Sequence, residues 1–267
     1  MDTVDRRTVL ATGALALAGA ATHSVPAAAQ AGPKSIFAVG TTTIPIVGET
    51  DVFPVRRIYC IGRNYAAHSR EMGSDPTREP PFFFQKPGDA VQVVMPGETA
   101  EHPYPSVTKN YHYDVELVAA LNKGGRNIPV EKALDCVYGY AVGLDMTRRD
   151  LQSEMKDGKK PWDIGKGFDN GAPIGPIHPV AKSGHFNTGE ISLTVNGTVK
   201  QKADLSDMIW SVAEQISRLS QLFEMKAGDL IMSGTPENVG PVIVGDTMTA
   251  KIAGLPDLSM KIVKPAA

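Results

Sequence analysis

Alternating hydrophobic and polar residues predict more strands than helices in this chain. The clearest case is ISLTVNGTVKQ at 191–201, where two alternating segments flank Asn196-Gly197, a pair that favours a type I′ hairpin turn. Longer apolar runs predict buried strands, and amphipathic spacing predicts helices, with Thr147 as the expected N-cap of one of them. The strands are expected at 56–62, 82–86, 111–121 and 136–146, and the helices at 63–73, 131–135, 147–158 and 206–223. The sequence therefore predicts a mixed α+β fold that is rich in strands.

The composition is that of one globular domain. The 267 residues are 42% hydrophobic and 21% charged, with a formal net charge of −2 and a pI of about 6.3. The sequence has no cluster of basic residues of the kind that binds nucleic acid. No repeat or low-complexity linker divides the chain, so we expect one main domain at 56–267, preceded by an arm at 32–55.

Residues 1–31 have the pattern of an export signal. Arg6 and Arg7 precede an apolar run at 9–21, and small residues at 27–31 offer cleavage sites. The paired arginines favour the twin-arginine type, which predicts a periplasmic protein, whereas an unused signal would leave the protein in the cytoplasm. The apolar run is shorter than the roughly 20 residues that a transmembrane helix needs, so we expect no membrane association after the signal is removed.

The two cysteines lie inside apolar runs. Cys60 is part of RIYCIG, and Cys136 is part of LDCVYGY. This context favours buried, unpaired thiols over a disulfide, and two cysteines without a spacing motif do not predict a zinc site.

Two carboxylates occur within the predicted strand YHYDVELVAAL. Asp114 and Glu116 are two residues apart, so their side chains share one face, where like charges repel and burial is costly. A solvated strand face or an ion pair with arginine would make the arrangement tolerable. A divalent metal ion would do the same, since Mg²⁺ and Ca²⁺ prefer oxygen ligands. Asp145, at the end of the apolar run YGYAVGLD, is a third candidate ligand.

A second group of polar residues could carry acid–base chemistry. His68 and Glu71 are three apart in a predicted helix, so the carboxylate could orient the imidazole as a general base, although a surface His with a nearby Glu has the same spacing. Lys166 lies between two glycines and could stabilise an oxyanion. Gln152 and Thr235 are weaker candidates when each is considered alone.

The motifs together carry more information than any one of them. In order they are GRNYAAH with REM, FFQKP, YHYDVEL, GYAVGLDMTRRDLQ, GKGFD, VNG and SGTPENVGPV. This series resembles the fumarylacetoacetate hydrolase family over residues 54–264. Within the family, EPPFFFQK and ALDCVYGYAVGLDMTRRDLQ are most similar to the acylpyruvate hydrolases, the fumarylpyruvate hydrolases in particular.

The resemblance implies a β-roll of mixed sheets, usually as a homodimer, and a bound Mg²⁺ or Mn²⁺, with Ca²⁺ as an alternative. It places the metal ligands at Asp114, Glu116 and Asp145, although many relatives have Glu at the position of Asp114. The resemblance assigns catalysis to His68, Glu71, Lys166 and Gln152, and substrate contacts to Arg63, Tyr65, Lys86 and Thr235.

The implied reaction is hydrolysis of the C–C bond of an acylpyruvate, most simply fumarylpyruvate, giving fumarate and pyruvate. The same site could instead decarboxylate oxaloacetate or isomerise an unsaturated keto diacid. Neither alternative needs a hydrolytic water, so His68 and Glu71 favour hydrolysis. A non-catalytic exported protein that binds keto acids is the alternative from another class.

Overall fold

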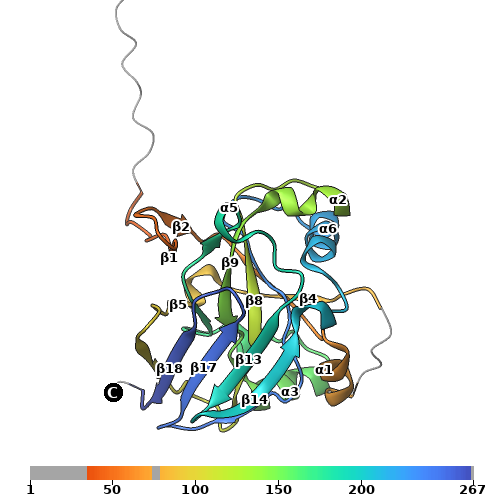
Figure 1. Ribbon diagram of the computed structural model, residues 1–267. Coiled ribbons are helices and arrows are strands. Elements are labelled where there is room, and N and C mark those ends of the chain that lie inside the picture. Colours follow the sequence, from red (N-terminus) through yellow and green to blue (C-terminus); the bar gives the residue numbers. More distant parts are fainter. Residues whose placement is uncertain (1–34, 74–78, 266–267) are drawn as a thin grey trace, which may run out of the picture. The chain divides into compact units, whose positions relative to one another are not determined.

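A computed structural model describes residues 35–73 and 79–265 of the chain (Figure 1). The chain divides into two compact units, 1–39 and 40–267, and the elements below belong to the second. Two large sheets dominate this unit. The first has eight strands in the order β4-β3-β15-β8-β9-β11-β5, with β12 paired to β9, and the second has five strands in the order β14-β13-β17-β18-β6.

The bounds of the elements are as follows. The larger sheet contains β3 (Ile58–Ile61), β4 (Phe83–Lys86), β5 (Val91–Val93), β8 (Val115–Leu121), β9 (Val137–Leu144), β11 (Ala172–Ile174), β12 (His178–Pro179) and β15 (Leu230–Met232). The five-stranded sheet contains β6 (Thr99–Pro103), β13 (Glu190–Val195), β14 (Thr198–Asp204), β17 (Thr247–Ile252) and β18 (Leu258–Val263). Smaller sheets are formed by β1 (Thr43–Pro45) with β2 (Val52–Pro54), and by β10 (Thr147–Arg148), β7 (Tyr111–Tyr113) and β16 (Gly240–Val242). The helices are α1 (Ala66–Glu71), α2 (Val130–Ala133), α3 (Arg149–Asp157), α4 (Asp163–Lys166), α5 (Val180–Ser183) and α6 (Val212–Leu222), with 3₁₀ turns η1 (Gly88–Ala90), η2 (Leu134–Cys136) and η3 (Leu205–Asp207).

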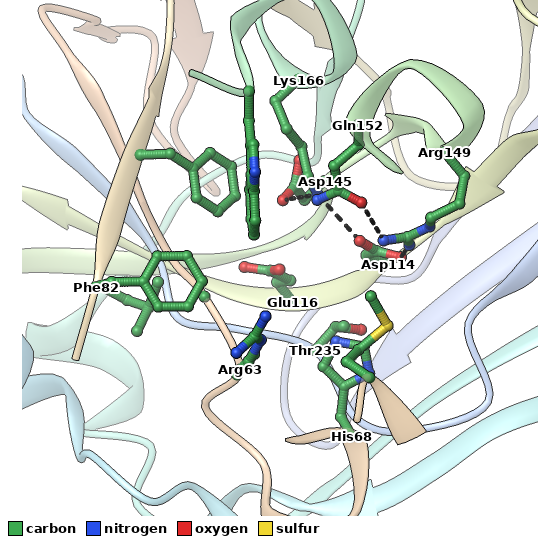
Figure 2. Close-up of a pocket in the computed structure, with 15 residues that line it drawn as sticks. Arg63, His68, Phe82, Asp114, Glu116, Asp145, Arg149, Gln152, Lys166 and Thr235 are labelled. Atoms are coloured by element: carbon green, nitrogen blue, oxygen red, sulfur yellow. Dashed lines mark hydrogen bonds and ion pairs between the residues drawn. The ribbon is translucent and has the colours of Figure 1, made fainter. Parts of the chain in front are cut away.

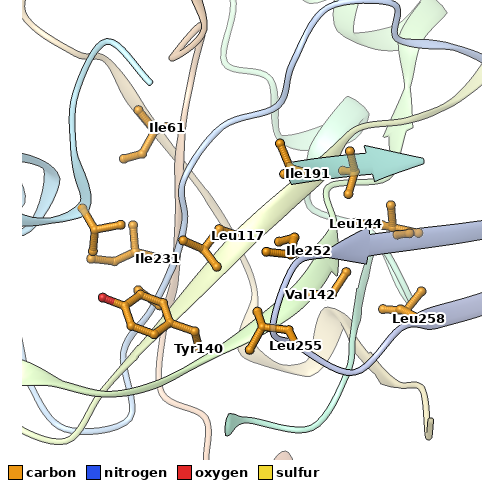
Figure 3. Close-up of a cluster of buried hydrophobic side chains, with 14 of the residues drawn as sticks. Ile61, Leu117, Tyr140, Val142, Leu144, Ile191, Ile231, Ile252, Leu255 and Leu258 are labelled. Atoms are coloured by element: carbon orange, nitrogen blue, oxygen red, sulfur yellow. The ribbon is translucent and has the colours of Figure 1, made fainter. Parts of the chain in front are cut away.

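Strand β8 is buried on both faces, because each face packs against a different hydrophobic cluster. Leu117 lies in the cluster that fills the space between the two large sheets, together with Ile191 and Ile252 of the five-stranded sheet (Figure 3). Val118 and Ala120 belong to a second cluster on the opposite face. Side chains alternate along a strand, so Asp114 and Glu116 lie on the Val118 side, at the end of this second cluster.

The register of β8 and β9 brings distant carboxylates together. The two strands are antiparallel, with Val115 opposite Leu144, and the amide of Asp145 donates a hydrogen bond to the carbonyl of Asp114 at 2.9 Å. Asp114 and Asp145 are therefore cross-strand neighbours just beyond the regular ladder.

The predicted β-rich α+β class is confirmed, and so is the hairpin, where Asn196 and Gly197 have φ of 51° and 77° as a type I′ turn requires. The predicted strand at 111–121 is interrupted at Asp114 and forms two strands, β7 and β8, in different sheets. Helix α6 is shorter than predicted, since a capping box of Ser211 and Glu214 begins it at Val212.

The prediction that Thr147 caps a helix is wrong. Helix α3 begins two residues later, after Arg148, and its first turn receives no side-chain cap. Thr147 belongs to β10, and its hydroxyl donates to the carboxylate of Asp114 at 3.2 Å and to the carbonyl of Asp145 at 3.0 Å. The tertiary contact with two acidic residues takes the hydroxyl away from the helix end.

Cys60 and Cys136 are buried free thiols, as predicted. Among the residues that the structure describes, no helix has the length and apolarity that crossing a membrane requires. The predicted boundaries at 31 and 55 stay predictions, and residues 1–31 lie outside the described part of the chain.

Candidate active site

One pocket collects most of the predicted site residues (Figure 2). It lies where the ends of β8 and β9 meet helices α1, α3 and α4. Its lining includes the predicted residues Arg63, His68, Asp114, Glu116, Asp145, Gln152, Lys166 and Thr235. Eight positions spread over 173 residues of sequence, from 63 to 235, are thus placed around one hollow.

Asp114 is held by two cations although it is buried. Arg149 donates to its Oδ1 at 2.7 Å, and Lys166 donates to its Oδ2 at 3.1 Å. Burial alone would raise the pKa of Asp114, but Arg149 and Lys166 outweigh it and lower the pKa to about 2. The carboxylate is therefore ionised at neutral pH.

Asp145 shares the ammonium of Lys166 and has a second lysine behind it. Lys166 Nζ lies 2.7 Å from Oδ2, and Lys86 Nζ lies 2.9 Å from Oδ1. Burial opposes a charged Lys166, but Asp145 and Asp114 raise its pKa, so the ammonium is retained. Lys86 is fully buried and also donates to the carbonyls of Met146 and Lys166, so it supports the pocket from behind and does not line it.

Glu116 is the least compensated of the three carboxylates. Its Oε2 accepts a hydrogen bond of 2.8 Å from the amide of Gly234, yet burial and then the nearby Asp145 raise its pKa well above the usual value. In the described part of the chain, no lysine or arginine nitrogen lies within 4.0 Å of this carboxylate. Gly234 has φ of +98°, and a Cβ there would approach the Cβ of Asn64 to 2.6 Å, so this contact requires glycine.

His68 and Glu71 form the predicted pair on α1. His68 Nδ1 lies 2.9 Å from Glu71 Oε2, and both oxygens of Glu71 also accept from the amide of Asn238 at 3.1 Å. Because the carboxylate can only accept, Nδ1 carries the hydrogen and Nε2 is left as a proton acceptor. His68 is buried and lines the pocket.

Arg149 is the main polar residue that sequence reasoning missed. Besides Asp114 it donates to Gln152 Oε1 at 2.7 Å, so it links a predicted metal ligand to a predicted catalytic residue. Its position three residues before Gln152 on α3, which places both on one helix face, was the available signal. The aromatic side chains of Phe82, Phe84 and Trp162, which form one wall of the pocket, were missed as well.

Tyr65 is not brought into the pocket. It is fully buried, its hydroxyl has no hydrogen-bond partner in the described structure, and it borders a separate hollow with Arg70 and Lys202. Thr235 does line the pocket, and its hydroxyl accepts a hydrogen bond of 2.9 Å from the side-chain amide of Gln201. Gln201 belongs to β14 and was also missed by sequence reasoning.

The donor set fits a hard divalent cation in its chemistry. Three buried carboxylates supply six oxygen atoms, and among the described residues no lysine or arginine pairs with Glu116. Within the described residues, however, no three acidic, imidazole or thiol side chains converge closely enough to hold an ion as they stand. The ammonium of Lys166 lies between Asp114 and Asp145, so a bound cation would take over its role in balancing these charges.

The chain is similar to proteins that act on keto acids. A solved structure of fumarylpyruvate hydrolase from Pseudomonas aeruginosa in complex with Mn²⁺ and pyruvate is 55% identical, has a TM-score of 0.86, and is covered in full by 87% of this chain. A fumarylpyruvate hydrolase of Ralstonia sp. is 40% identical over 188 residues, which is 70% of this chain and 95% of that protein. A mitochondrial oxaloacetate tautomerase of Arabidopsis thaliana is 38% identical over 212 residues, 78% of this chain and 93% of that protein. The Mn²⁺ of the Pseudomonas structure agrees with the predicted class of cofactor.

The prediction of export through residues 1–31 is wrong. Several similar proteins have a location in their names, and that location is mitochondrial, not extracytoplasmic. Residues 1–34 lie outside the described residues, so the structure adds nothing in favour of export. An arginine pair before an alanine-rich run is a pattern of composition, and composition alone does not decide whether a segment is recognised for transport.

The family itself is shown by the match to a family model. The model for the fumarylacetoacetate hydrolase C-terminal domain matches residues 57–263, which is most of the chain and includes every residue of the pocket. This agrees with the resemblance that the motifs indicated and with the β-rich α+β fold. The chain belongs to the fumarylacetoacetate hydrolase family.

Proposed function

We propose that the protein is a metal-dependent hydrolase that cleaves the C–C bond of an acylpyruvate, with fumarylpyruvate as its substrate. The observation that carries this proposal is the His68–Glu71 pair in the same pocket as Asp114, Glu116 and Asp145 (Figure 2). A base that can take a proton from water thus faces a group of oxygen ligands. The similarity to two fumarylpyruvate hydrolases supports the choice of substrate.

Asp114, Glu116 and Asp145 would hold Mg²⁺ or Mn²⁺. When bound, the ion would supply Lewis-acid polarisation and a template for the keto-carboxylate end of the substrate. The three side chains bring three negative charges when ionised, and a divalent cation offsets two of them in a buried site. Burial and then the nearby Asp145 raise the pKa of Glu116, and a bound cation would favour its ionised form against both.

The side chains around the carboxylates have separate roles in hydrolysis. His68 Nε2 takes a proton from water, and Glu71 stabilises the imidazolium that forms. The water oxygen attacks the acyl carbonyl, the C–C bond breaks, and its electron pair moves into the pyruvate enolate. The enolate then takes a proton from the His68 imidazolium and leaves as pyruvate. The Lys166 ammonium, which lines the same pocket, stabilises the developing enolate charge. Arg149 occupies Gln152 Oε1, which leaves the amide nitrogen of Gln152 to donate to the attacked oxygen.

A second candidate is tautomerisation or decarboxylation of oxaloacetate in the same pocket. The similarity to an oxaloacetate tautomerase of Arabidopsis thaliana favours it. Decarboxylation needs no base and leaves the alignment of His68 by Glu71 without a role. Tautomerisation could use that base, but the similarity to a fumarylpyruvate hydrolase is higher, at 55% identity against 38% for the tautomerase. We therefore rank this activity second.

The proposal is tested with the full-length chain after removal of metal and addition of Mg²⁺ or Mn²⁺. Loss of the enol absorbance of fumarylpyruvate and acetylpyruvate is followed with release of pyruvate, and oxaloacetate is run alongside. We expect metal-dependent cleavage of an acylpyruvate. Turnover of oxaloacetate alone would favour the second candidate, and metal and keto-acid binding without turnover would point to a binding protein.

His68→Ala tests the role of the base. We expect hydrolysis to fall by about 100-fold or more, the usual contribution of a general base, with Mn²⁺ affinity unchanged by calorimetry. His185→Ala is the matched control, because this histidine is exposed and does not line the pocket. Hydrolysis by His68→Ala at the wild-type rate would remove His68 from the mechanism.

Two further expectations are part of the proposal. Residues 56–267 would form the catalytic domain with 32–55 as an arm, and two copies of the chain would form a homodimer. Light scattering coupled to gel filtration measures the second directly, and a monomer at micromolar concentration would contradict it.

A further inference from the structure

The cations that line the pocket are not all used in the same way. Arg149 and Lys166 are both committed to carboxylates of the protein, at 2.7 Å from Asp114 and 2.7 Å from Asp145 respectively. Arg63 is different. Within the described residues its guanidinium donates no hydrogen bond and has no carboxylate within 4.0 Å, although it lines the same pocket.

The position of Arg63 is nevertheless well defined. Its backbone has φ of +56°, a conformation that costs a residue with a side chain about 1 kcal/mol or more. The next residue holds it there, because the buried amide of Asn64 donates to the carbonyls of Trp210 at 2.9 Å and Ser233 at 2.7 Å and accepts from the amide of Trp210 at 2.8 Å. These three hydrogen bonds fix the chain at Asn64, directly after Arg63.

An aromatic wall supports the guanidinium. The carbon Cζ of Arg63 lies 5.5 Å from the ring centroid of Phe82, within the range of a cation–π contact. Phe82 in turn meets Trp162 edge to face, with ring centroids 5.3 Å apart, and Phe84 contacts Trp162 at 5.7 Å. The ring of Phe82 also covers Gly62, where a Cβ would come within 1.9 Å of it.

Figure 2 shows how these groups lie in the pocket. Arg63 and Phe82 are on the side away from Lys166 and Arg149, and Glu116 lies between the two sets. A substrate whose keto-carboxylate end is bound at the carboxylates would therefore extend its acyl group along the aromatic rings toward Arg63. Flat apolar rings suit a planar unsaturated chain, and a guanidinium suits a carboxylate at the end of that chain.

We propose that Arg63 is a specificity-determining residue that binds a second carboxylate, at the far end of the acyl group. This inference rests on the proposed function and deepens it, since it selects acylpyruvates with a dicarboxylic acyl group over those with a neutral one. Arg63 does not take part in bond breaking. Its removal therefore reduces the preference between substrates and leaves the chemical step on a neutral acyl group intact.

The test compares two substrates in two variants. Arg63→Met keeps much of the side-chain length without charge, and Arg63→Lys keeps the charge without the fork of donors. In Arg63→Met we expect kcat/KM for fumarylpyruvate to fall by about 10- to 100-fold, mostly through KM, the size of a lost charge-assisted contact. Acetylpyruvate, which has no second carboxylate, should change less than about threefold, and Arg63→Lys should recover part of the loss.

The control is Arg70→Met, which removes an exposed arginine of α1 that does not line the pocket. It should leave the ratio of the two substrates unchanged. An equal loss on both substrates in Arg63→Met would assign Arg63 to folding or chemistry, and no loss on either substrate would remove it from recognition. Either result overturns the proposal.

A binding measurement separates this inference from the proposed function. Fumarate and crotonate differ by one carboxylate, and calorimetry on the full-length protein loaded with Mn²⁺ measures both without turnover. We expect fumarate to bind more tightly than crotonate, and Arg63→Met to abolish the difference. Equal affinities in the wild-type protein would overturn the role of Arg63, even if acylpyruvates were hydrolysed. A difference that depends on Arg63 would support it, even if hydrolysis were absent.

Discussion

Replacement of Lys166 by Met should destabilise the metal-free protein and strengthen its binding of metal. The ammonium lies 3.1 Å from Asp114 and 2.7 Å from Asp145, with the lysine side chain only 3% exposed. Methionine fills a similar volume without charge, so the change removes the electrostatic contact and leaves the packing almost intact. The two carboxylates then face each other with less positive charge between them.

The size of the loss can be bounded from the structure. Removing one partner of a buried ion pair commonly costs about 3–5 kcal/mol. Asp114 keeps Arg149 and Asp145 keeps Lys86, which reduces the cost. A carboxylate can also take up a proton, which for an ordinary Asp at pH 7 costs about 4 kcal/mol and sets a ceiling. We therefore expect a loss of about 3 kcal/mol in the free energy of unfolding.

The assay is urea denaturation at pH 7 in EDTA and in excess Mn²⁺, with calorimetry of Mn²⁺ binding to the folded protein. A ligand at about 100 times its Kd adds about 2.7 kcal/mol to the stability of either protein. In the variant the ion no longer competes with an ammonium, so its affinity should rise by about 10- to 100-fold while hydrolysis is lost. Lys182→Met is the control, because this lysine is half exposed and its pair with Glu49 is long, at 3.6 Å.

Unchanged stability of Lys166→Met in EDTA would contradict this prediction, because it would mean that the ammonium does not balance the buried carboxylates. Weaker Mn²⁺ binding in the variant would contradict the predicted competition between Lys166 and the ion, since it would show that Lys166 helps the ion to bind. The two measurements are independent, so stability and Mn²⁺ affinity can each differ from the expected result on their own.

Three further predictions concern the framework around the site. Leu117→Ala empties a fully buried position between the two large sheets and should cost about 3 kcal/mol in urea denaturation; a loss below 1 kcal/mol would contradict the packing described. Gly234→Ala should lower the free energy of unfolding by about 2 kcal/mol or more and weaken Mn²⁺ binding through Glu116. Gly245→Ala is the control, because Gly245 has a similar φ of +103° and no atom near the position of a Cβ. It should show the backbone strain alone and bind Mn²⁺ normally, as urea denaturation and calorimetry would measure. Burial lowers the pKa of His102 from 6.5 to about 4, so the unfolded chain binds the proton of His102 at a higher pH than the folded chain does. The contribution of His102 to stability is therefore full above pH 6.5 and falls by about 3 kcal/mol as the pH drops through 4. His102→Gln should remove this part of the pH dependence between pH 7 and 4, and an unchanged profile would show that His102 is not buried as a neutral ring.

Local patterns were enough to predict the elements whose structure depends on local interactions. The hairpin at 191–201 depends on two turn residues and on alternation within a few positions, and the His68–Glu71 pair depends on spacing along one helix. Turn geometry and helix spacing act over two to four residues, so the sequence displays them directly. The motif series, which spans the chain, was enough to indicate the family and the three carboxylates.

The organisation of the pocket could not be obtained in this way. Asp114 interrupts the expected strand and meets Arg149, 35 residues away, and Thr147 leaves its expected helix cap for the same carboxylate. Lys86, predicted to touch substrate, supports Asp145 from behind, and Tyr65 borders a separate hollow.

From the amino-acid order alone, a β-rich fold of this family could be predicted, and three carboxylates and a histidine could be named as candidates for its site. Tertiary structure alone decided which cation balances which carboxylate, and which arginine of the pocket has no acidic partner among the described residues. The physical reason is that turn and helix preferences arise within a few residues. Burial and ion pairing instead depend on which strands the register brings together, as the pairing of β8 with β9 does for Asp114 and Asp145.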